Sequence, residues 1–131
     1  MKNQLSICSF EQAKRLREIE FDWITDKFYH DNGILDSGAG LTPKNYNVSE
    51  FAFSAPTVAL ALKWFRDEKD LVPIIRFRDT KEKYYNTIKF TQANEIDYSW
   101  VNLYLDGFFD TYELAESVLL DELLNLIEKE K

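Results

Sequence analysis

The chain is poor in the residues on which most catalytic and metal chemistry depends. It has one cysteine, Cys8, and one histidine, His30, among 131 residues. A single cysteine cannot form an internal disulfide, and a structural zinc site needs four suitable ligands, so the sequence predicts neither. No motif supports a Cys–His nucleophilic pair. We therefore expect a reducing, cytoplasmic setting, no metal and no other cofactor.

Long apolar runs are also missing. The longest are short, such as VALAL at residues 58–62, whereas a membrane-spanning helix needs about 20 apolar residues. The N-terminal segment has no long apolar region and no cleavage site of small residues, so it does not predict a signal peptide. We therefore expect no membrane partner.

Motifs that hold cofactors or activate nucleophiles are missing as well. GAG at residues 38–40 lacks the following glycine of a dinucleotide-binding loop. DNG at residues 31–33 resembles part of a calcium loop, but Phe28 stands where an EF-hand has aspartate. There is no P-loop and no Gly-x-Ser-x-Gly, and no pair of carboxylates stands out for acid–base work. The sequence thus predicts a non-enzymatic protein.

The composition nevertheless predicts a folded chain. Hydrophobic residues make up 45% and aromatic residues 15% of it, which is too apolar for a disordered protein. The length predicts one domain over residues 1–131, with a first part at 1–53 and a second at 54–131. The net charge is −7, and residues 106–131 carry eight acidic and two basic side chains. This balance disfavours non-specific nucleic-acid binding, whereas the acidic segment favours solubility or a basic partner.

The first part predicts a helix followed by a hairpin. Ser9 is a predicted N-cap and Gln12 completes a capping box, so a helix is expected over residues 10–19. The β-branched and aromatic run at residues 21–29 predicts a strand. The tight-turn residues at 31–33 then lead into a returning strand, which is followed by a loop.

The second part predicts the order helix, three strands, helix. Ser54 and Pro56 predict the start of a helix that ends near residue 69. Asp110 is the predicted N-cap of a last helix over residues 111–129. The strands between them are expected at residues 72–78, 83–91 and 98–105. The fold class is therefore α+β, with an antiparallel meander that has helices packed on one face and an edge strand that begins near Pro73.

Strand alternation predicts that basic and aromatic side chains share the sheet face that points away from the helices. These residues are Arg76, Arg78, Tyr85, Lys89, Trp100 and Tyr104. Aromatic rings stack on bases and arginine contacts phosphate, so the set is a candidate nucleic-acid or peptide surface. Two alternatives stay open: ordinary cross-strand pairing, and coverage by residues 1–53 or by a second copy of the chain.

Two helices carry more apolar surface than one core requires. In the helix after Ser54, Leu60 and Trp64 lie away from the main apolar arc, and in the last helix Leu114 and Leu124 flank the polar stripe. These four residues form a candidate partner surface, which could also serve a homodimer. The alternative is that both helices are packed deeply in the core.

Three segments carry a resemblance to known sequences. They are CSFEQAKRLREIEFDW, SAPTVALALKWFRDEKD and FDTYELAESVLLDELLNLI, with Ala-Pro-Thr at 55–57, Lys-Trp-x-Arg at 63–66 and Thr-Tyr-Glu-x-Ala at 111–115. This pattern resembles a group of small uncharacterised proteins of Bacteroidales and of their phages and prophages. The resemblance implies a phage-linked or mobile-element setting and supplies no catalytic residues.

Two functional hypotheses follow from these features. The first is a non-enzymatic protein that binds another protein, with a homodimer as one form of that interaction. The second is a nucleic-acid-binding module that uses the Arg/Tyr/Trp sheet face, although the net charge disfavours it.

Overall fold

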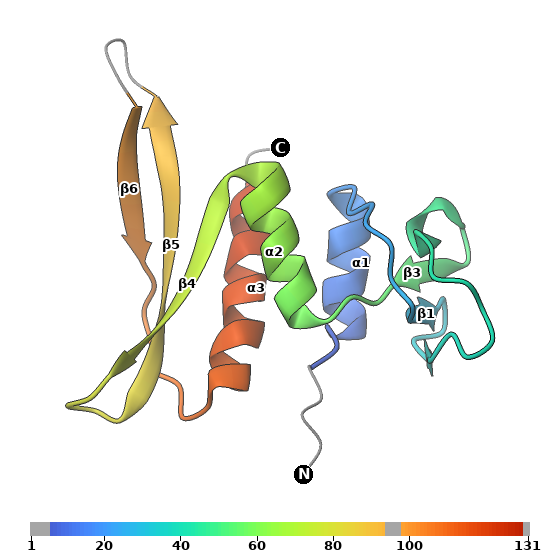
Figure 1. The fold of residues 1–131 in the computed structure, drawn as a ribbon, viewed down its shortest axis with the longest axis horizontal. Coiled ribbons are helices and arrows are strands. Elements are labelled where there is room, and N and C mark those ends of the chain that lie inside the picture. The colour runs from blue at the N-terminus through green and yellow to red at the C-terminus, as the bar shows by residue number, and fades with distance from the viewer. Residues whose placement is uncertain (1–5, 94–97, 130–131) are drawn as a thin grey trace. The chain divides into compact units, whose positions relative to one another are not determined.

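The chain has the predicted α+β fold, seen in a computed structural model (Figure 1). The structure describes residues 6–93 and 98–129, without the side chains of residues 91–93 and 98–100. The elements in chain order are α1 (Phe10–Glu18), β1 (Phe28–His30), β2 (Leu35–Asp36), the 3-10 helix η1 (Tyr46–Val48), β3 (Ala52–Ser54), α2 (Val58–Lys69), β4 (Leu71–Arg78), β5 (Lys83–Ala93), β6 (Tyr98–Tyr104) and α3 (Tyr112–Lys129).

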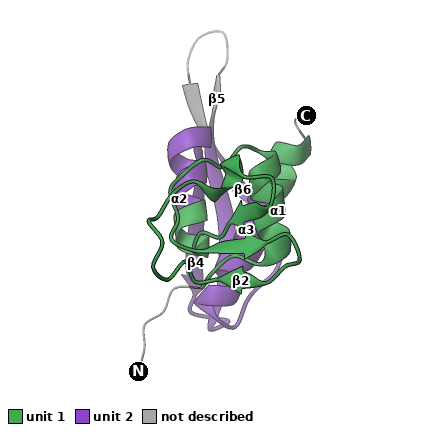
Figure 2. Cartoon of the chain, turned by 90° about the vertical axis from the view of Figure 1, so that its right-hand side faces the viewer, with its two compact units in different colours: residues 1–61, 124–131 green, residues 62–123 purple. Residues whose placement is uncertain are grey.

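The chain divides into two compact units (Figure 2). Unit 1 comprises residues 1–61 and 124–131, and unit 2 comprises residues 62–123. The division therefore falls inside α2 and α3, whereas the sequence placed the boundary between two parts of one domain at residues 53 and 54. It also assigns the last turns of α3 to the first unit, a long-range connection that no local pattern indicates.

Both ends of α1 follow from local chemistry. Ser9 Oγ accepts a hydrogen bond from the Gln12 amide at 3.1 Å, and Gln12 Oε1 accepts one from the Ser9 amide at 2.9 Å, so the predicted capping box is confirmed. Glu20 then takes a φ of 69°, and the Phe21 amide reaches back to the Leu16 carbonyl at 3.0 Å. A left-handed residue after the helix usually is glycine, so Glu20 adopts this backbone at a cost.

The strand predicted over residues 21–29 is only three residues long. β1 begins at Phe28, because the backbone before it has other partners. The Phe21 amide ends α1, the Phe21 carbonyl accepts from Asn47, and Thr25 makes an isolated bridge with Lys44. The predicted turn and returning strand are confirmed, since β1 pairs antiparallel with β2.

A strand that the sequence did not predict completes the first sheet. β3 pairs antiparallel with the free side of β1, which gives the order β2-β1-β3. The buried residues Phe28, Tyr46 and Ala52 form the small core of this sheet, and the first two rings stack with centroids 4.3 Å apart. A three-residue strand is too short to show an alternating pattern, which is why sequence reasoning missed it.

Asn47 connects three segments of unit 1. Its Nδ2 donates to the Phe21 carbonyl at 2.9 Å, and its Oδ1 accepts from the Ser54 amide at 2.8 Å. Its own amide donates to Asn45 Oδ1 at 2.9 Å, which caps η1. One side chain thus satisfies backbone groups that follow α1 and lie in β3.

The predicted start of α2 is wrong by three to four residues. Ser54 lies in β3, where its Oγ accepts from the Tyr46 amide at 3.0 Å, and the Pro56 carbonyl accepts from the Cys8 amide at 3.0 Å. Thr57 takes the capping role, because its Oγ1 accepts from the Leu60 amide at 3.1 Å and the helix begins at Val58. Because the Ser54 hydroxyl accepts a hydrogen bond from Tyr46, Ser54 does not cap α2.

Unit 2 contains the predicted antiparallel meander in the order β4-β5-β6. β4 is an edge strand, as the position of Pro73 predicted. Figure 1 shows α2 and α3 on the same side of this sheet. Buried residues of unit 2 include Leu62, Trp64, Phe65, Ile88, Ala115, Leu119, Leu120 and Leu123.

The predicted N-cap of α3 is also displaced. Thr111 Oγ1 accepts from the Leu114 amide at 3.1 Å, so Thr111 caps the helix in place of Asp110. Asp110 instead pairs with Lys83 at the start of β5. A short acidic side chain can cap a helix or form an ion pair, and Asp110 forms the ion pair.

Glu116 is a buried acid on α3. It is 9% exposed, and burial raises its pKa above the ordinary range for glutamate, with a further contribution from the negative charge of Glu113. The native state therefore holds this proton to a higher pH than the unfolded chain does. Below the ordinary glutamate pKa, Glu116 makes its full contribution to the free energy of unfolding. That contribution is lost as the pH rises through the pKa of Glu116 in the native state.

We predict that Asn47→Ala lowers the free energy of unfolding by about 2 kcal/mol, because two hydrogen bonds are removed and their backbone partners stay unpaired. Denaturant unfolding followed by circular dichroism measures this change. Asn45→Ala is the matched control, because it removes only the cap of η1 and should cost about 1 kcal/mol or less. Equal losses for the two variants would contradict the connecting role of Asn47.

We predict that Glu116→Gln raises the melting temperature near neutral pH, because it removes a buried charge. The difference from wild type should vanish below about pH 4, where glutamate is protonated in the native and unfolded states. Thermal melts across this range test the sign. Glu50→Gln, at an exposed position, should change the melting temperature little, and a pH-independent gain for Glu116→Gln would argue against the electrostatic cause.

Candidate functional site

One face of the β4-β5-β6 sheet gathers most of the predicted nucleic-acid or peptide residues. In the strand register, Arg76 pairs with Tyr85, Thr87 with Tyr104, and Lys89 with Asn102. Directly paired residues point to the same side of a sheet. We call this side the open sheet face, and its members are Val72, Ile74, Arg76, Arg78, Lys83, Tyr85, Thr87, Lys89, Asn102 and Tyr104.

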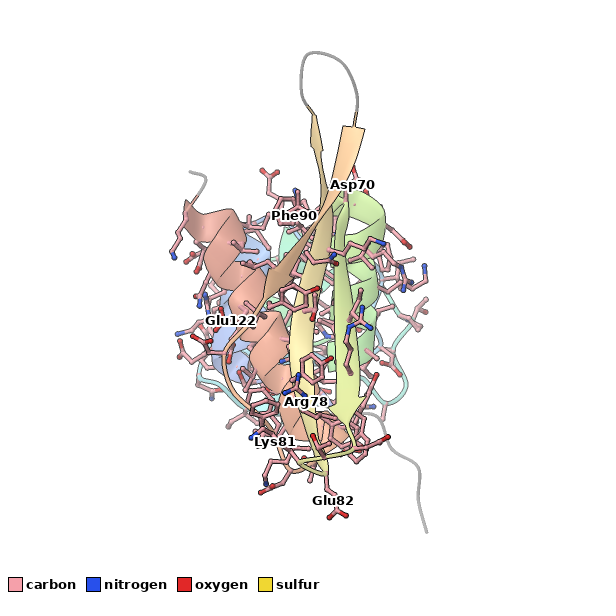
Figure 3. All side chains as sticks on the ribbon, turned by 90° about the vertical axis from the view of Figure 1, so that its left-hand side faces the viewer. Asp70, Arg78, Lys81, Glu82, Phe90 and Glu122 are labelled. Carbon is pink, nitrogen blue, oxygen red and sulfur yellow. The ribbon has the colours of Figure 1, made fainter. Side chains whose placement is uncertain are left out.

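The opposite side of the sheet belongs to α3. Asn86, one position along β5 from Tyr85, is 1% exposed and its Nδ2 donates to the Ala115 carbonyl of α3 at 2.9 Å. In Figure 3 the strands lie in front of the helices α2 and α3, with Arg78 on the near side. Five of the six predicted residues are thus placed together. The sixth, Trp100, pairs with Thr91 through its backbone, and its side chain lies outside the described residues.

The charged strand residues of the open sheet face are all basic, although acidic residues lie next to them. The basic members are Arg76, Arg78, Lys83 and Lys89. Asp79 and Glu82 are exposed in the turn between β4 and β5, and Asp110 pairs with Lys83. Arg76 and Arg78 are exposed. This concentration of cations contrasts with the net charge of −7 for the whole chain.

Aromatic rings and cations meet at one end of this face. Arg78 Cζ lies 5.6 Å from the ring centroid of Tyr85 and 5.7 Å from that of Phe108. Lys81 Nζ lies 5.0 Å from the Phe108 centroid, and the Tyr85 and Phe108 rings are 6.1 Å apart. We call Arg78, Lys81, Tyr85 and Phe108 the cation–aromatic cluster, and contacts of this kind are favourable at about 0.5–1 kcal/mol each on a surface.

Sequence reasoning missed Lys81 and Phe108, because strand alternation says nothing about turns and loops. Lys81 lies in the turn between β4 and β5, and Phe108 follows Gly107, whose φ is 107°. A residue other than glycine would be strained there. An aromatic residue directly after an Asp-Gly pair was the available signal that the chain turns back toward the sheet.

The centre of the open sheet face is closed. Thr87 is 0% exposed, and its register neighbours are Ile74 on β4 and Tyr104 on β6. Its Oγ1 is buried and has no hydrogen-bond partner in the described part of the chain. Among the described residues, the centre of the face is therefore filled, and the face offers a surface to a partner.

A depression of about 410 Å³ lies in unit 1, lined by Arg17, Glu20, Phe21, Asp22, Asn45 and Asn47. Several of these polar groups hold the backbone. Arg17 Nη1 donates to the Ala52 carbonyl at 2.9 Å, and both ends of the Asn47 amide are hydrogen-bonded to main chain. These polar side chains stabilise the local backbone, and the lining residues do not present an obvious acid–base pair.

The four residues of the predicted partner surface do not form one exposed patch. Trp64 is 2% exposed and Leu124 is 0% exposed, while Leu60 is half-buried and Leu114 is 50% exposed. Trp64 packs edge-on against Phe65 with ring centroids 5.2 Å apart. The structure thus agrees with the alternative of deep packing for Trp64 and Leu124.

Cys8 and His30, the only residues from which a Cys–His nucleophilic pair could be built, have different environments in the structure. Burial raises the pKa of the Cys8 thiol to about 12, so it is protonated at neutral pH and is a poor nucleophile. His30 Nε2 lies 3.0 Å from Asp36 Oδ2 across the β1–β2 hairpin. The Asp36 carboxylate also accepts from the Gly38 amide, and these two contacts lower its pKa, the amide first.

Within residues 6–93 and 98–129, no group of three or more His, Cys, Asp or Glu side chains is placed to hold a metal ion. No described helix is both long enough and apolar enough to cross a bilayer. Comparison with protein-family models, with curated proteins and with solved structures found no match for this chain.

We predict that Trp64→Ala lowers the free energy of unfolding by about 3–5 kcal/mol, because a large buried side chain leaves a cavity. Chemical denaturation measures the loss, and light scattering on the same sample reports the oligomeric state. Leu114→Ala is the control, because its half-exposed side chain should cost much less. A Trp64→Ala variant that stays fully stable and only loses self-association would show that Trp64 serves an interface.

Proposed function

We propose that this chain is a non-enzymatic binding protein and that the open sheet face contacts an anionic macromolecule. The observation that carries the proposal is the sign of the charges. The strand residues of this face include four basic side chains, of which Lys83 is paired with Asp110, and no acidic one, in a chain with a net charge of −7. Complementary charge favours the correct partner and speeds its association. Arg76, Arg78 and the 68% exposed ring of Tyr104 supply the contacts.

A binding role without catalysis agrees with the chemistry of the described residues. The Cys8 thiol is protonated, the centre of the face is filled by Thr87, and the polar lining of the depression in unit 1 holds backbone groups. A binding surface requires only exposed, well-placed side chains. The phage-linked setting implied by the sequence resemblance stays a prediction.

A protein partner with an acidic surface is one form of this proposal. Tyrosine and arginine are enriched among the residues that dominate protein–protein binding energy. The open sheet face offers both kinds of residue, with Tyr85 and Phe108 already fixed beside Arg78. Such fixed side chains lose little conformational entropy when a partner binds.

We predict that the wild-type chain is retained on immobilised heparin, a sulfated polyanion, at low salt despite its net negative charge. The triple variant Arg76→Ala/Arg78→Ala/Lys89→Ala should elute at clearly lower salt, because it lacks three cations that attract the sulfate groups. Salt-gradient elution measures the difference, and circular dichroism checks that both proteins are folded.

The control variant changes the net charge by the same amount, but its substitutions lie outside the open sheet face. Lys27→Ala/Lys44→Ala/Lys129→Ala removes three cations of unit 1. It should elute close to wild type. The proposal fails if the wild-type chain flows through at low salt, or if the two triple variants elute at the same position.

A further inference from the structure

We infer that the macromolecule bound by the open sheet face is a single-stranded nucleic acid, an inference that rests on the function proposed above and names its partner. The face separates two kinds of contact. Its exposed arginines lie on the edge strand β4, and its most exposed aromatic ring, Tyr104, lies on the other edge strand, β6. A nucleotide has the same division, with a charged phosphate at one end and a flat base at the other.

The arginine edge suits a phosphate backbone. Arg76 and Arg78 alternate along β4, so their side chains leave the strand about 6.6 Å apart on the same side. That is a spacing of the same order as that between successive phosphates of an extended strand. The planar guanidinium group offers paired N–H donors to phosphate oxygens. Val72 and Ile74, the other β4 residues on this face, bring no competing charge.

The aromatic edge suits unpaired bases. Neighbouring strands lie about 4.8 Å apart, so Tyr104 stands about 10 Å across the sheet from the arginine edge. Tyr104 is 68% exposed, and Phe108 in the loop after β6 is 41% exposed. Base–aromatic stacking tolerates any sequence, because every base has a flat face.

Two other anionic partners fit less well. The bases of a duplex are stacked on one another, so an exposed ring on a flat sheet cannot reach their faces. An acidic peptide would engage the arginines, but it has no planar group that needs Tyr104. The combination of β4 cations with an exposed β6 ring therefore favours single strands over both.

Fluorescence anisotropy with labelled oligo-dT and oligo-U of about twelve nucleotides tests the inference at about 50 mM salt. We expect binding with a slope of log affinity against log salt of about −1.4, for the two phosphates that Arg76 and Arg78 would neutralise. Tyr104→Leu should weaken binding about tenfold or more, whereas Tyr104→Phe should keep the stacking and the affinity. Arg76→Ala/Arg78→Ala should weaken binding and make the slope shallower by about 0.7 for each phosphate that is no longer neutralised.

Phe51→Leu is the matched control for Tyr104→Leu, because Phe51 in unit 1 is 69% exposed. It should leave the affinity unchanged, and thermal melts should show that every variant is folded. The inference is overturned if a duplex binds as tightly as the single strands, if Tyr104→Leu binds like wild type, or if a polyglutamate peptide is preferred. Heparin retention that depends on the face, together with no oligonucleotide binding, would reject nucleic acid and leave the anionic binding surface standing. Failure of both experiments would reject both proposals.

Discussion

The buried amide of Asn86 commits the sheet of unit 2 to two unequal faces. Its Nδ2 donates to the Ala115 carbonyl of α3 at 2.9 Å, and the side chain is 1% exposed. The Oδ1 of the same amide is also buried and has no hydrogen-bond partner among the described residues, so this one bond offsets only part of the cost of burying the amide. Because side chains alternate along β5, fixing Asn86 against α3 directs Tyr85 and Thr87 to the other side. The open sheet face, with its cations and rings, depends on that single register.

The sequence predicted unit 2 better than unit 1, because the strands of unit 2 are longer and show a clearer alternating pattern. β4, β5 and β6 are long enough for alternation to be visible, and their edges were placed within about two residues. In unit 1 the strands have two or three residues, and the segment before Phe28 is held by Asn47 and by Lys44 across the loop. Such interactions are long-range, so local propensity cannot report them.

The two misplaced helix caps share one cause. Ser54 and Asp110 are good N-cap residues by type, but the Ser54 hydroxyl accepts from the Tyr46 amide and the Asp110 carboxylate pairs with Lys83. In each helix a neighbouring threonine supplies the cap. The burial of Trp64 has a similar origin, because a helical wheel identifies apolar residues without showing which of them other segments cover. Arg76 and Tyr104, in contrast, lie on the face that was predicted for them, because the alternation of side chains is local to each strand.

The net charge of the chain was the main sequence argument against a nucleic-acid ligand, and it weakens once the acidic residues have positions. Glu113 and Asp121 lie on α3, which contacts the other side of the sheet through Asn86 of β5. A packed layer is about 10 Å thick, so the acidic groups of α3 are farther from an anion on the open sheet face than the arginines of β4 are. An anion that approaches the open sheet face therefore interacts more strongly with the arginines of β4 than with the acidic groups of α3. Local distribution, more than the total of −7, decides which partners this face can hold.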